Sequence, residues 1–158
     1  MNQAEKIPFS VAMSVYKNDS PEQLEVALES ICTQSLPADE IYLVIDGPVG
    51  QELHAVIQKF SDRYGNFTIN QLEKNGGLGN ALRIAVEKCR NDLILRMDSD
   101  DISAPGRFKK QIDAYLQEPA DVLGGWTLGF VGNLETGKVS SAKRKLTSEE
   151  IVKQIGIK

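Results

Sequence analysis

The sequence contains few of the residues that build many catalytic and metal centres, with one histidine, two cysteines and one tryptophan among 158 residues. Because His54 has no second histidine as a companion ligand, it is left out of the predicted site. Cys32 and Cys89 have no close-spaced partner, and residues 1–8 are too polar for a secretory leader, so we expect reduced thiols and a cytoplasmic protein. No stretch approaches the ~20 apolar residues of a membrane span, which leaves at most peripheral association with a membrane.

Positive charge is also in short supply, since 18 Lys and Arg against 22 Asp and Glu give a formal net charge of −4. This balance provides no general attraction to nucleic acid or to an anionic membrane surface, so an anionic ligand needs a local site. Nucleic acid is therefore not an expected partner. Hydrophobic residues make up 41% of the chain, enough for one core, and the length predicts a single domain.

Alternating apolar segments define the expected fold. Short apolar runs predict strands over 9–15, 41–45, 67–72 and 93–97, and helical spacing predicts helices from Pro21, over 53–60 and over 78–89. Ser20 and Gln23 form a capping box at the start of the first helix. This alternation predicts an α/β fold with a mostly parallel, Rossmann-like sheet flanked by helices on both faces. A further amphipathic helix follows over 108–116, and a β-like segment over 122–131.

The segment 91–101 is the most informative part of the chain, because an apolar strand runs directly into three carboxylates. Asp98 and Asp100 are two residues apart, which places both side chains on one face of an extended chain. Their oxygens are hard ligands of the kind that Mg²⁺ or Mn²⁺ takes, and a cation with few protein ligands usually also binds phosphates. The alternative is a polar turn that caps the next helix, although a turn needs only one Asp.

A glycine-rich loop over 75–79 precedes the third predicted helix. Glycines let backbone amides approach a ligand closely, and the positive end of the helix dipole favours a nucleotide's phosphate or ribose edge. Leu82 stands where a dinucleotide fingerprint has its third small residue, but Asp98 follows at about the distance of a ribose-binding acid, so a nicotinamide enzyme stays open as a minor alternative.

Each of the four predicted strands ends in polar residues, namely 16–20, Asp46, 74–80 and 98–101. The carboxyl ends of parallel strands meet at one edge of the sheet, where open α/β sheets bind ligands. We therefore expect the four segments to line one crevice.

This set of motifs, in this order, resembles the family 2 glycosyltransferases, which have the GT-A fold and use nucleotide-sugar donors. The resemblance covers about residues 7–131 and rests on the segments 9–16, 44–47 and 75–82 and on Asp98-Ser99-Asp100-Asp101 as a D-x-D motif. Arg107 and Gln111 also fit the helix that follows this motif.

The resemblance implies a site and a reaction. Ser14 and Tyr16 would lie near the nucleoside, Asp46 would accept a hydrogen bond from the base, usually uracil, and Asp98 would touch ribose or metal. Asp100 would ligate the divalent cation. The other implied contacts to the nucleotide come from Gly76 in the glycine loop and from Asn80 or Arg83. The implied reaction is inverting transfer of a sugar from a nucleotide-sugar, with a UDP-sugar as the expected donor, to a saccharide or lipid-linked acceptor hydroxyl in surface polysaccharide synthesis.

The catalytic base is not identified. Family members use an acidic residue well downstream of D-x-D, and here only Glu135, Glu149 and Glu150 follow Val131, none in a matching context. Thr147 and Glu150 cap a predicted helix that stops at Lys158 after barely two turns, so we expect the natural protein to continue. The expected organisation is a tail over 1–8, a nucleotide-sugar-binding domain over 9–131 and the start of an acceptor-side region over 132–158.

Two other classes stay open. In haloacid-dehalogenase-type phosphotransferases an apolar strand also ends in Asp-x-Asp, and the first Asp is the nucleophile. A non-catalytic nucleotide-binding module, whose binding site persists while transfer is lost, would also carry these motifs.

Overall fold

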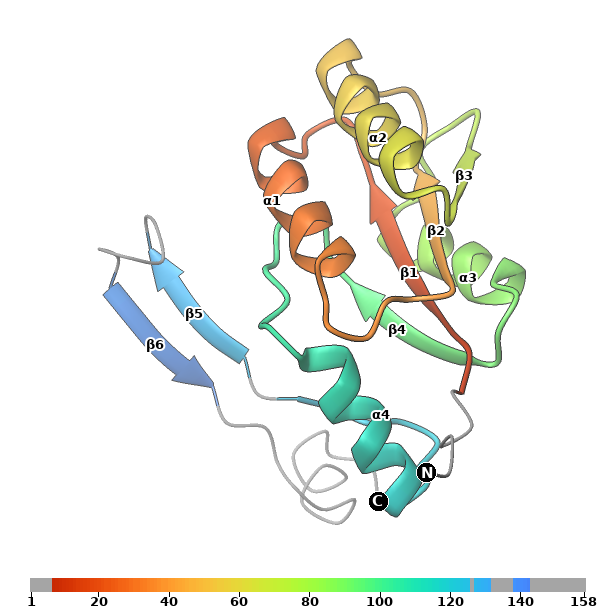
Figure 1. Cartoon of the computed structure of the whole chain (residues 1–158). Helices are drawn as coiled ribbons and strands as arrows, with labels where there is room; N and C mark the ends of the chain where they lie inside the picture. The colour runs from red at the N-terminus through yellow and green to blue at the C-terminus, as the bar shows by residue number, and fades with distance from the viewer. Residues whose placement is uncertain (1–6, 126, 132–137, 143–158) are drawn as a thin grey trace, which may run out of the picture. The chain divides into compact units, whose positions relative to one another are not determined.

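A computed structural model describes residues 7–125, 127–131 and 138–142 of the chain (Figure 1). Four parallel strands form one sheet in the order β3-β2-β1-β4, and two antiparallel strands form a separate pair. The elements are β1 (Phe9–Val15), α1 (Pro21–Cys32), β2 (Glu40–Ile45), α2 (Gln51–Tyr64), β3 (Phe67–Gln71), α3 (Leu78–Lys88), β4 (Leu93–Met97), α4 (Arg107–Gln117), β5 (Thr127–Val131) and β6 (Lys138–Ala142). The predicted α/β fold with a mostly parallel sheet is confirmed.

The two central strands, β1 and β2, are buried along their whole length. Helices cover both faces, as continuous apolar strands require. α1, α2 and the first half of α4 pack on one face, and α3 packs on the other (Figure 1). The larger core lies on the first face, where Phe9 and Phe108 meet edge to face with ring centroids 5.4 Å apart.

The first helix begins where its sequence predicts. The backbone N–H of Gln23 donates to the Ser20 hydroxyl at 3.3 Å, and Pro21 occupies the first helical position, where its missing N–H costs no hydrogen bond. The helix buries Leu24, Ala27, Leu28 and Ile31 at the predicted spacing.

The third helix differs from its predicted packing. The helical spacing over 78–89 comes from Leu78, Leu82, Ala85, Val86 and Cys89. Of these Ala85 is buried, together with Ala81, whereas Leu78 and Val86 are 54% and 51% exposed. Small side chains let this helix lie close to Ala12 on β1 and to Val44 on β2. The contact therefore follows the alanines, which a count of large apolar residues does not detect.

The amino end of the sheet is closed by a buried acid that the sequence left outside the predicted strand. The Glu40 carboxylate accepts hydrogen bonds from the Ser10 hydroxyl at 2.7 Å, the Thr68 hydroxyl at 3.0 Å and the Arg90 backbone N–H at 2.7 Å. The Arg90 guanidinium lies 3.2 Å from the same carboxylate. Burial raises the pKa of Glu40, but these hydrogen bonds and the Arg90 charge outweigh it, so the pKa lies below its ordinary value.

Contacts within the chain group it into two compact units, 1–112 and 113–158. The predicted domain boundary at residue 131 stays a prediction. The predicted helix capped by Thr147 and Glu150 lies outside the described residues. Within the described ranges, every helix is too short or too polar to cross a membrane.

Candidate functional site

The polar segments that follow the four parallel strands meet at the carboxyl edge of the sheet. The segment after β2 is bonded to the loop after β3, and the turn after β1 is bonded to the loop after β4. The backbone N–H of Asp46 donates to the carbonyl oxygen of Val15 at 2.7 Å, which joins the ends of the two central strands. The convergence predicted from alternating strands and helices is thus visible in specific contacts.

Asp46 connects the end of β2 to the glycine loop. The side chain is 2% exposed, and its carboxylate accepts from the backbone N–H of Gly76 at 2.7 Å, from that of Gly77 at 2.8 Å and from the Asn75 amide at 3.0 Å. All three donors belong to the loop that precedes α3. The carboxylate therefore holds the loop in shape, whereas the predicted contact of Asp46 with a base stays a prediction.

Gly47 permits the close approach of the two segments. A β-carbon at this position would lie 2.5 Å from the backbone nitrogen of Asn75, and the residue has φ +85°. Both observations favour glycine, because L side chains rarely adopt this conformation and the neighbouring atom belongs to the backbone.

The start of α3 carries two predicted nucleotide contacts on adjacent turns. A β-carbon on Gly76 would lie 2.5 Å from the Asn80 amide nitrogen, so the two residues are in close contact. Arg83 donates to the Asn80 amide oxygen at 3.1 Å and forms an ion pair with Glu87 at 2.6 Å. The Arg83 guanidinium is thus already directed along the helix surface, and its contact with a nucleotide stays a prediction.

Ser14 and Tyr16 lie at the end of β1 with different exposure. Ser14 is 9% exposed and pairs in register with Val44 of β2, whereas Tyr16 is 41% exposed beyond the strand. A ring exposed at the ligand edge is available to a nucleoside.

The acidic loop after β4 contains one paired and two exposed carboxylates. Asp98 accepts two hydrogen bonds from the Arg96 guanidinium, at 2.5 and 2.8 Å, and Asp100 and Asp101 are exposed. Burial and the negative charges of Asp98 and Asp100 raise the pKa of Asp101 above its ordinary value. Three carboxylates of like charge are therefore close together in this loop, and Arg96 pairs with one of them.

Arg107, at the start of α4, supports this loop from the core side. It donates to the carbonyl oxygen of Arg96 at 2.8 Å and to the Gln111 amide oxygen at 3.0 Å. Burial lowers the pKa of Arg107, while the charges of Asp101 and Asp98 oppose the shift. The guanidinium therefore supplies fixed positive charge beneath the acids.

Asp98 and Asp100 carry oxygen atoms of the kind that divalent cations take as ligands, and both oxygens of Asp98 bond the Arg96 guanidinium. No cluster of three or more His, Cys, Asp or Glu able to hold a metal occurs among the residues that the structure describes. Asp98 and Asp100 would supply two oxygens, and diphosphate oxygens and water would complete the shell, which is a common arrangement for Mg²⁺.

Sequence reasoning placed Asp19, Asn75 and Ser99 in the segments expected at this edge but assigned none of them a contact. Asp19 was treated as part of a turn, yet it accepts from the Ser99 hydroxyl 2.8 Å away. Asn75 binds Asp46, and no local pattern indicates that contact. The available signal was topological, because each of these residues lies just after a strand of the parallel sheet.

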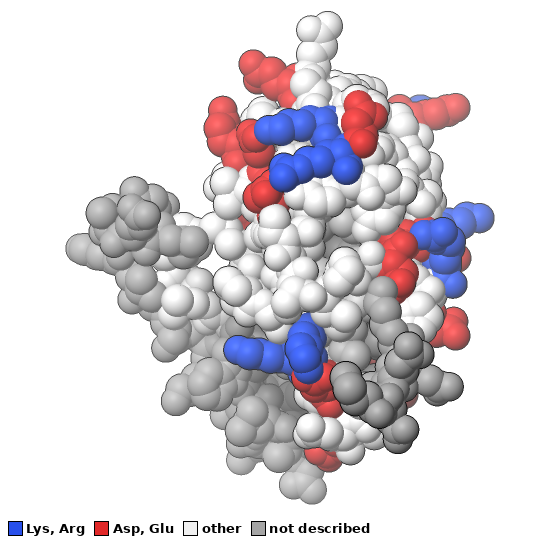
Figure 2. All heavy atoms as spheres, in the orientation of Figure 1, with Lys and Arg blue, Asp and Glu red and all other residues white. Residues whose placement is uncertain are grey.

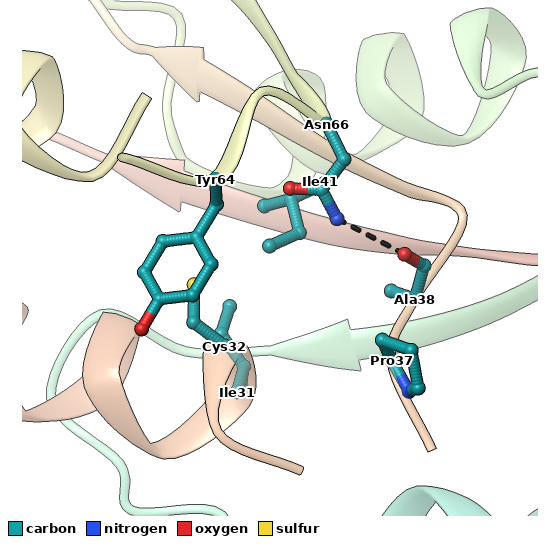
Figure 3. A pocket seen from close by; sticks show the side chains of 7 residues that line it. All are labelled: Ile31, Cys32, Pro37, Ala38, Ile41, Tyr64 and Asn66. Atoms are coloured by element: carbon teal, nitrogen blue, oxygen red, sulfur yellow. Dashed lines mark hydrogen bonds between the residues drawn. The ribbon is translucent and has the colours of Figure 1, made fainter. Parts of the chain in front are cut away.

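A cavity of about 250 Å³ lies away from this edge (Figure 3). It is formed where α1 and α2 end and where β2 begins, so it lies toward the amino end of the sheet. In Figure 3 the Asn66 amide donates to the carbonyl oxygen of Ala38 at 3.0 Å, across the wall of this cavity. None of its lining residues belongs to the predicted site.

Charges of both signs are mixed on the face of the molecule that Figure 2 shows. Acidic and basic side chains are interspersed on the face shown in Figure 2, and two ion pairs, Lys59–Glu25 and Arg63–Glu29, join α2 to α1. The candidate site is therefore characterised by the contacts among its residues, and the described residues on this face form no continuous patch of one charge sign.

Comparison with known proteins identifies the family. A family model described as glycosyl transferase family 2 matches residues 10–157, and the chain belongs to this family. It is 47% identical over 117 residues to the amylovoran biosynthesis glycosyltransferase AmsE of Erwinia amylovora, covering 74% of this chain and 44% of that protein. It is 41% identical over 127 residues to an Escherichia coli UDP-Gal:alpha-D-GlcNAc-diphosphoundecaprenol beta-1,3-galactosyltransferase, covering 79% of this chain and 46% of that protein.

A solved structure of similar fold is Staphylococcus aureus TarS 1–349 in complex with UDP. The TM-score is 0.58 at 26% identity, covering 71% of this chain and 32% of that chain. The likeness confirms the GT-A type of fold. The chain spans about half the length of the curated relatives it matches.

Proposed function

We propose that this chain is the nucleotide-sugar-binding part of a glycosyltransferase that builds a surface polysaccharide or related glycan. The observation that carries the proposal is that two loops lie at the carboxyl edge of one parallel sheet in a chain of this family. The glycine loop is bonded to the segment after β2, and the D-x-D loop is bonded to the turn after β1. A UDP-sugar is the proposed donor, because the galactosyltransferase relative is named for UDP-Gal and TarS binds UDP.

The proposed binding roles follow the geometry of the edge. Ser14 and Tyr16 lie beside the nucleoside, with the exposed Tyr16 ring available for stacking. Asn80 and Arg83, at the start of α3, contact the nucleotide's edge together with Gly76. Asp46 shapes this loop, and its carboxylate would have to share an existing hydrogen bond to reach the base as well.

Asp98 and Asp100 are the proposed metal ligands, with Mn²⁺ or Mg²⁺ as the cation. A cation bound there would stabilise the charge that develops on the nucleoside diphosphate as it leaves. Arg96 and Arg107 hold the acidic loop in place through the contacts described above.

Transfer is proposed to invert the anomeric centre, with a carboxylate removing the proton of the acceptor hydroxyl. No residue of this chain is assigned as that base. The proposed acceptor is a saccharide or a lipid-linked glycan, in keeping with the diphosphoundecaprenol in the name of the galactosyltransferase relative. With such an acceptor, the proposed location of sugar transfer is the cytoplasm, at the inner surface of a membrane.

The test is a thermal melt of the chain with UDP and Mn²⁺. A ligand that binds the folded state raises the melting temperature, and UDP with Mn²⁺ is expected to do so. Asp100→Ala should remove the metal-dependent part of this rise, whereas Asp62→Ala, on the exposed surface of α2, should leave it unchanged. No shift with UDP or with any other nucleoside diphosphate would refute the proposal.

The two other classes predict different outcomes. A haloacid-dehalogenase-type phosphotransferase would release phosphate from simple phosphomonoesters, and the match to family 2 does not favour it. A non-catalytic module would bind UDP with Mn²⁺ but would not hydrolyse or transfer the sugar of a UDP-sugar, even within a protein of the relatives' length.

A further inference from the structure

Asp19 joins two loops that are 80 residues apart in the sequence. Its Oδ2 atom accepts a hydrogen bond from the Tyr16 backbone N–H at 3.0 Å and another from the Ser99 hydroxyl at 2.8 Å. Tyr16 belongs to the turn after β1, and Ser99 is the central residue of the D-x-D motif. One carboxylate oxygen thus binds the proposed nucleoside side and the proposed metal side of the edge together.

The sheet explains why this contact can form. β1 and β4 are parallel neighbours, with Met13 opposite Met97, so the segments that follow them leave the sheet side by side. Asp19 and Ser99 are both half-buried, which shields the hydrogen bond from water more than an exposed pair would be. A hydrogen bond to a charged acceptor is worth more than one between neutral groups.

A local role does not account for both bonds. The bond from Tyr16 N–H, with the bond from Asp19 N–H to the Tyr16 carbonyl oxygen at 3.1 Å, closes an ordinary turn of four residues. That turn needs nothing from Ser99. The second bond instead ties the turn to a loop that already contains three carboxylates, and it brings a fourth negative charge next to them.

We infer that Asp19 is a positioning residue, which fixes the Asp98–Asp101 loop relative to the turn that carries Tyr16. This inference rests on the proposed function. Its consequence is that Asp19 and Ser99 set the position of the metal ligands with respect to the nucleoside. Loss of the bond should then weaken the metal-dependent part of nucleotide binding and spare the part that the nucleoside contributes.

The first measurement needs no ligand. Amide hydrogen exchange of the 158-residue chain is followed at Tyr16 and at residues 98–101. Ser99→Ala is expected to speed exchange at 98–101 only, whereas Asp19→Ala is expected to speed it at both places. Asp19→Asn should restore much of the protection, because the amide oxygen can still accept two hydrogen bonds. Ser35→Ala, an exposed serine after α1, is the matched control and should change neither.

The second measurement compares UDP affinity at saturating Mn²⁺ with UDP affinity in EDTA. Ser99→Ala is expected to weaken the former about tenfold, the effect of one hydrogen bond to a charged acceptor, and to change the latter less than about twofold. The double variant Asp19→Ala/Ser99→Ala should be no weaker than Asp19→Ala alone, since both substitutions remove the same bond.

The possible results separate the two claims. Unchanged exchange at 98–101 in Ser99→Ala, or additive losses in the double variant, would overturn the inference whatever the wild type binds. Absence of Mn²⁺-dependent UDP binding in the wild type would instead overturn the proposed function, and the exchange data would still report on the bond between Asp19 and Ser99.

Discussion

The guanidinium of Arg107 donates a hydrogen bond to the carbonyl oxygen of Arg96 over 2.8 Å, and this bond ties the start of α4 to the end of β4, just before the acidic loop. The same side chain reaches Gln111 through a second nitrogen atom. Arg107 thus uses its fork of donors in two directions at once, which a lysine cannot reproduce with the same geometry.

Replacing Arg107 by lysine should therefore weaken the attachment of the loop while keeping the charge. We expect a loss of about 1–2 kcal/mol in the free energy of unfolding, the usual range for one or two hydrogen bonds in a half-buried setting. Urea unfolding measures this loss. Lys110→Ala, on the exposed side of the same helix, should change stability by less than about 0.5 kcal/mol, and an equal loss in both variants would contradict the assignment.

Asp46→Asn should loosen the glycine loop. The N–H groups of Gly76 and Gly77 are bonded to different oxygens of the carboxylate, at 2.7 and 2.8 Å. The new amide keeps one of these acceptors and places an NH2 donor against the other glycine N–H. Leaving a buried donor unsatisfied costs about 1–3 kcal/mol, so the variant should be less stable by that amount. Faster amide exchange at residues 76 and 77 is the direct measurement.

The control for Asp46→Asn is Asp62→Asn, an exposed acid whose partner is the Gln58 amide. Its stability should match that of the wild type. If UDP still binds Asp46→Asn with Mn²⁺ but with altered preference among nucleoside bases, Asp46 also contacts the base, as the family resemblance predicts.

Comparing Gly47→Ala with Gly65→Ala separates the steric cost of an added methyl group from the cost of positive φ in the free energy of unfolding. Gly65 also has positive φ, at +67°, but a β-carbon there would meet nothing within 4 Å, so Gly65→Ala measures the conformational cost alone, about 1–2 kcal/mol. At Gly47 the β-carbon would also collide with the Asn75 backbone. We expect Gly47→Ala to lower the free energy of unfolding more than Gly65→Ala does, as measured in denaturant. Equal losses would show that the loop containing Asn75 can move away from the added methyl group at no cost.

The stability of the protein should fall in acid partly because of Glu40. Its folded-state pKa lies below the ordinary value of 4.5, so its contribution is present above about pH 4.5 and is lost as the pH falls through the lower, folded-state pKa. Glu40→Gln should cost about 2 kcal/mol near neutral pH, because it removes the charge that several donors share.

The difference in unfolding free energy between wild type and Glu40→Gln should then shrink as the pH falls below about 4.5. Glu25→Gln, which breaks only the exposed pair with Lys59, should cost less than about 1 kcal/mol at neutral pH. A difference between wild type and Glu40→Gln that does not vary with pH would contradict the role assigned to the Glu40 charge.

The two cysteines should react slowly with thiol reagents. Burial, with a smaller contribution from Glu29, raises the pKa of the Cys32 thiol to about 12, and burial also raises the pKa of Cys89. Because the thiolate is the reactive species, modification of the native chain near pH 8 should be much slower than in denaturant. Rapid labelling of either thiol in the folded state would contradict this expectation.

The strands and the first helices follow from local sequence. Apolar runs locate β1 and β4 to the residue, and Ser20 with Pro21 fixes the start of α1, because these signals act over a few positions. Packing that depends on distant partners is not encoded locally. Glu40 looks like a strand boundary in the sequence, yet it is buried, and its donors come from residues 28 to 50 positions away.

The candidate site likewise contains features that the sequence predicts and features that only the structure reveals. The family motifs indicate Asp46 and Asp98, and the topology indicates that they meet at one edge. The sequence does not indicate that Asp46 bonds the glycine loop or that Arg96 pairs with Asp98, since both depend on side-chain orientation. Asp19 lies in a turn whose composition explains it fully, so its bond to Ser99 is found only in the structure.

The network around Glu40 and the proposed ligand edge lie at opposite ends of the same strands, and they share no side chain among the contacts described here. Substitutions in the Glu40 network should therefore change the thermal stability of the protein with little direct effect on nucleotide binding at the carboxyl end of the sheet.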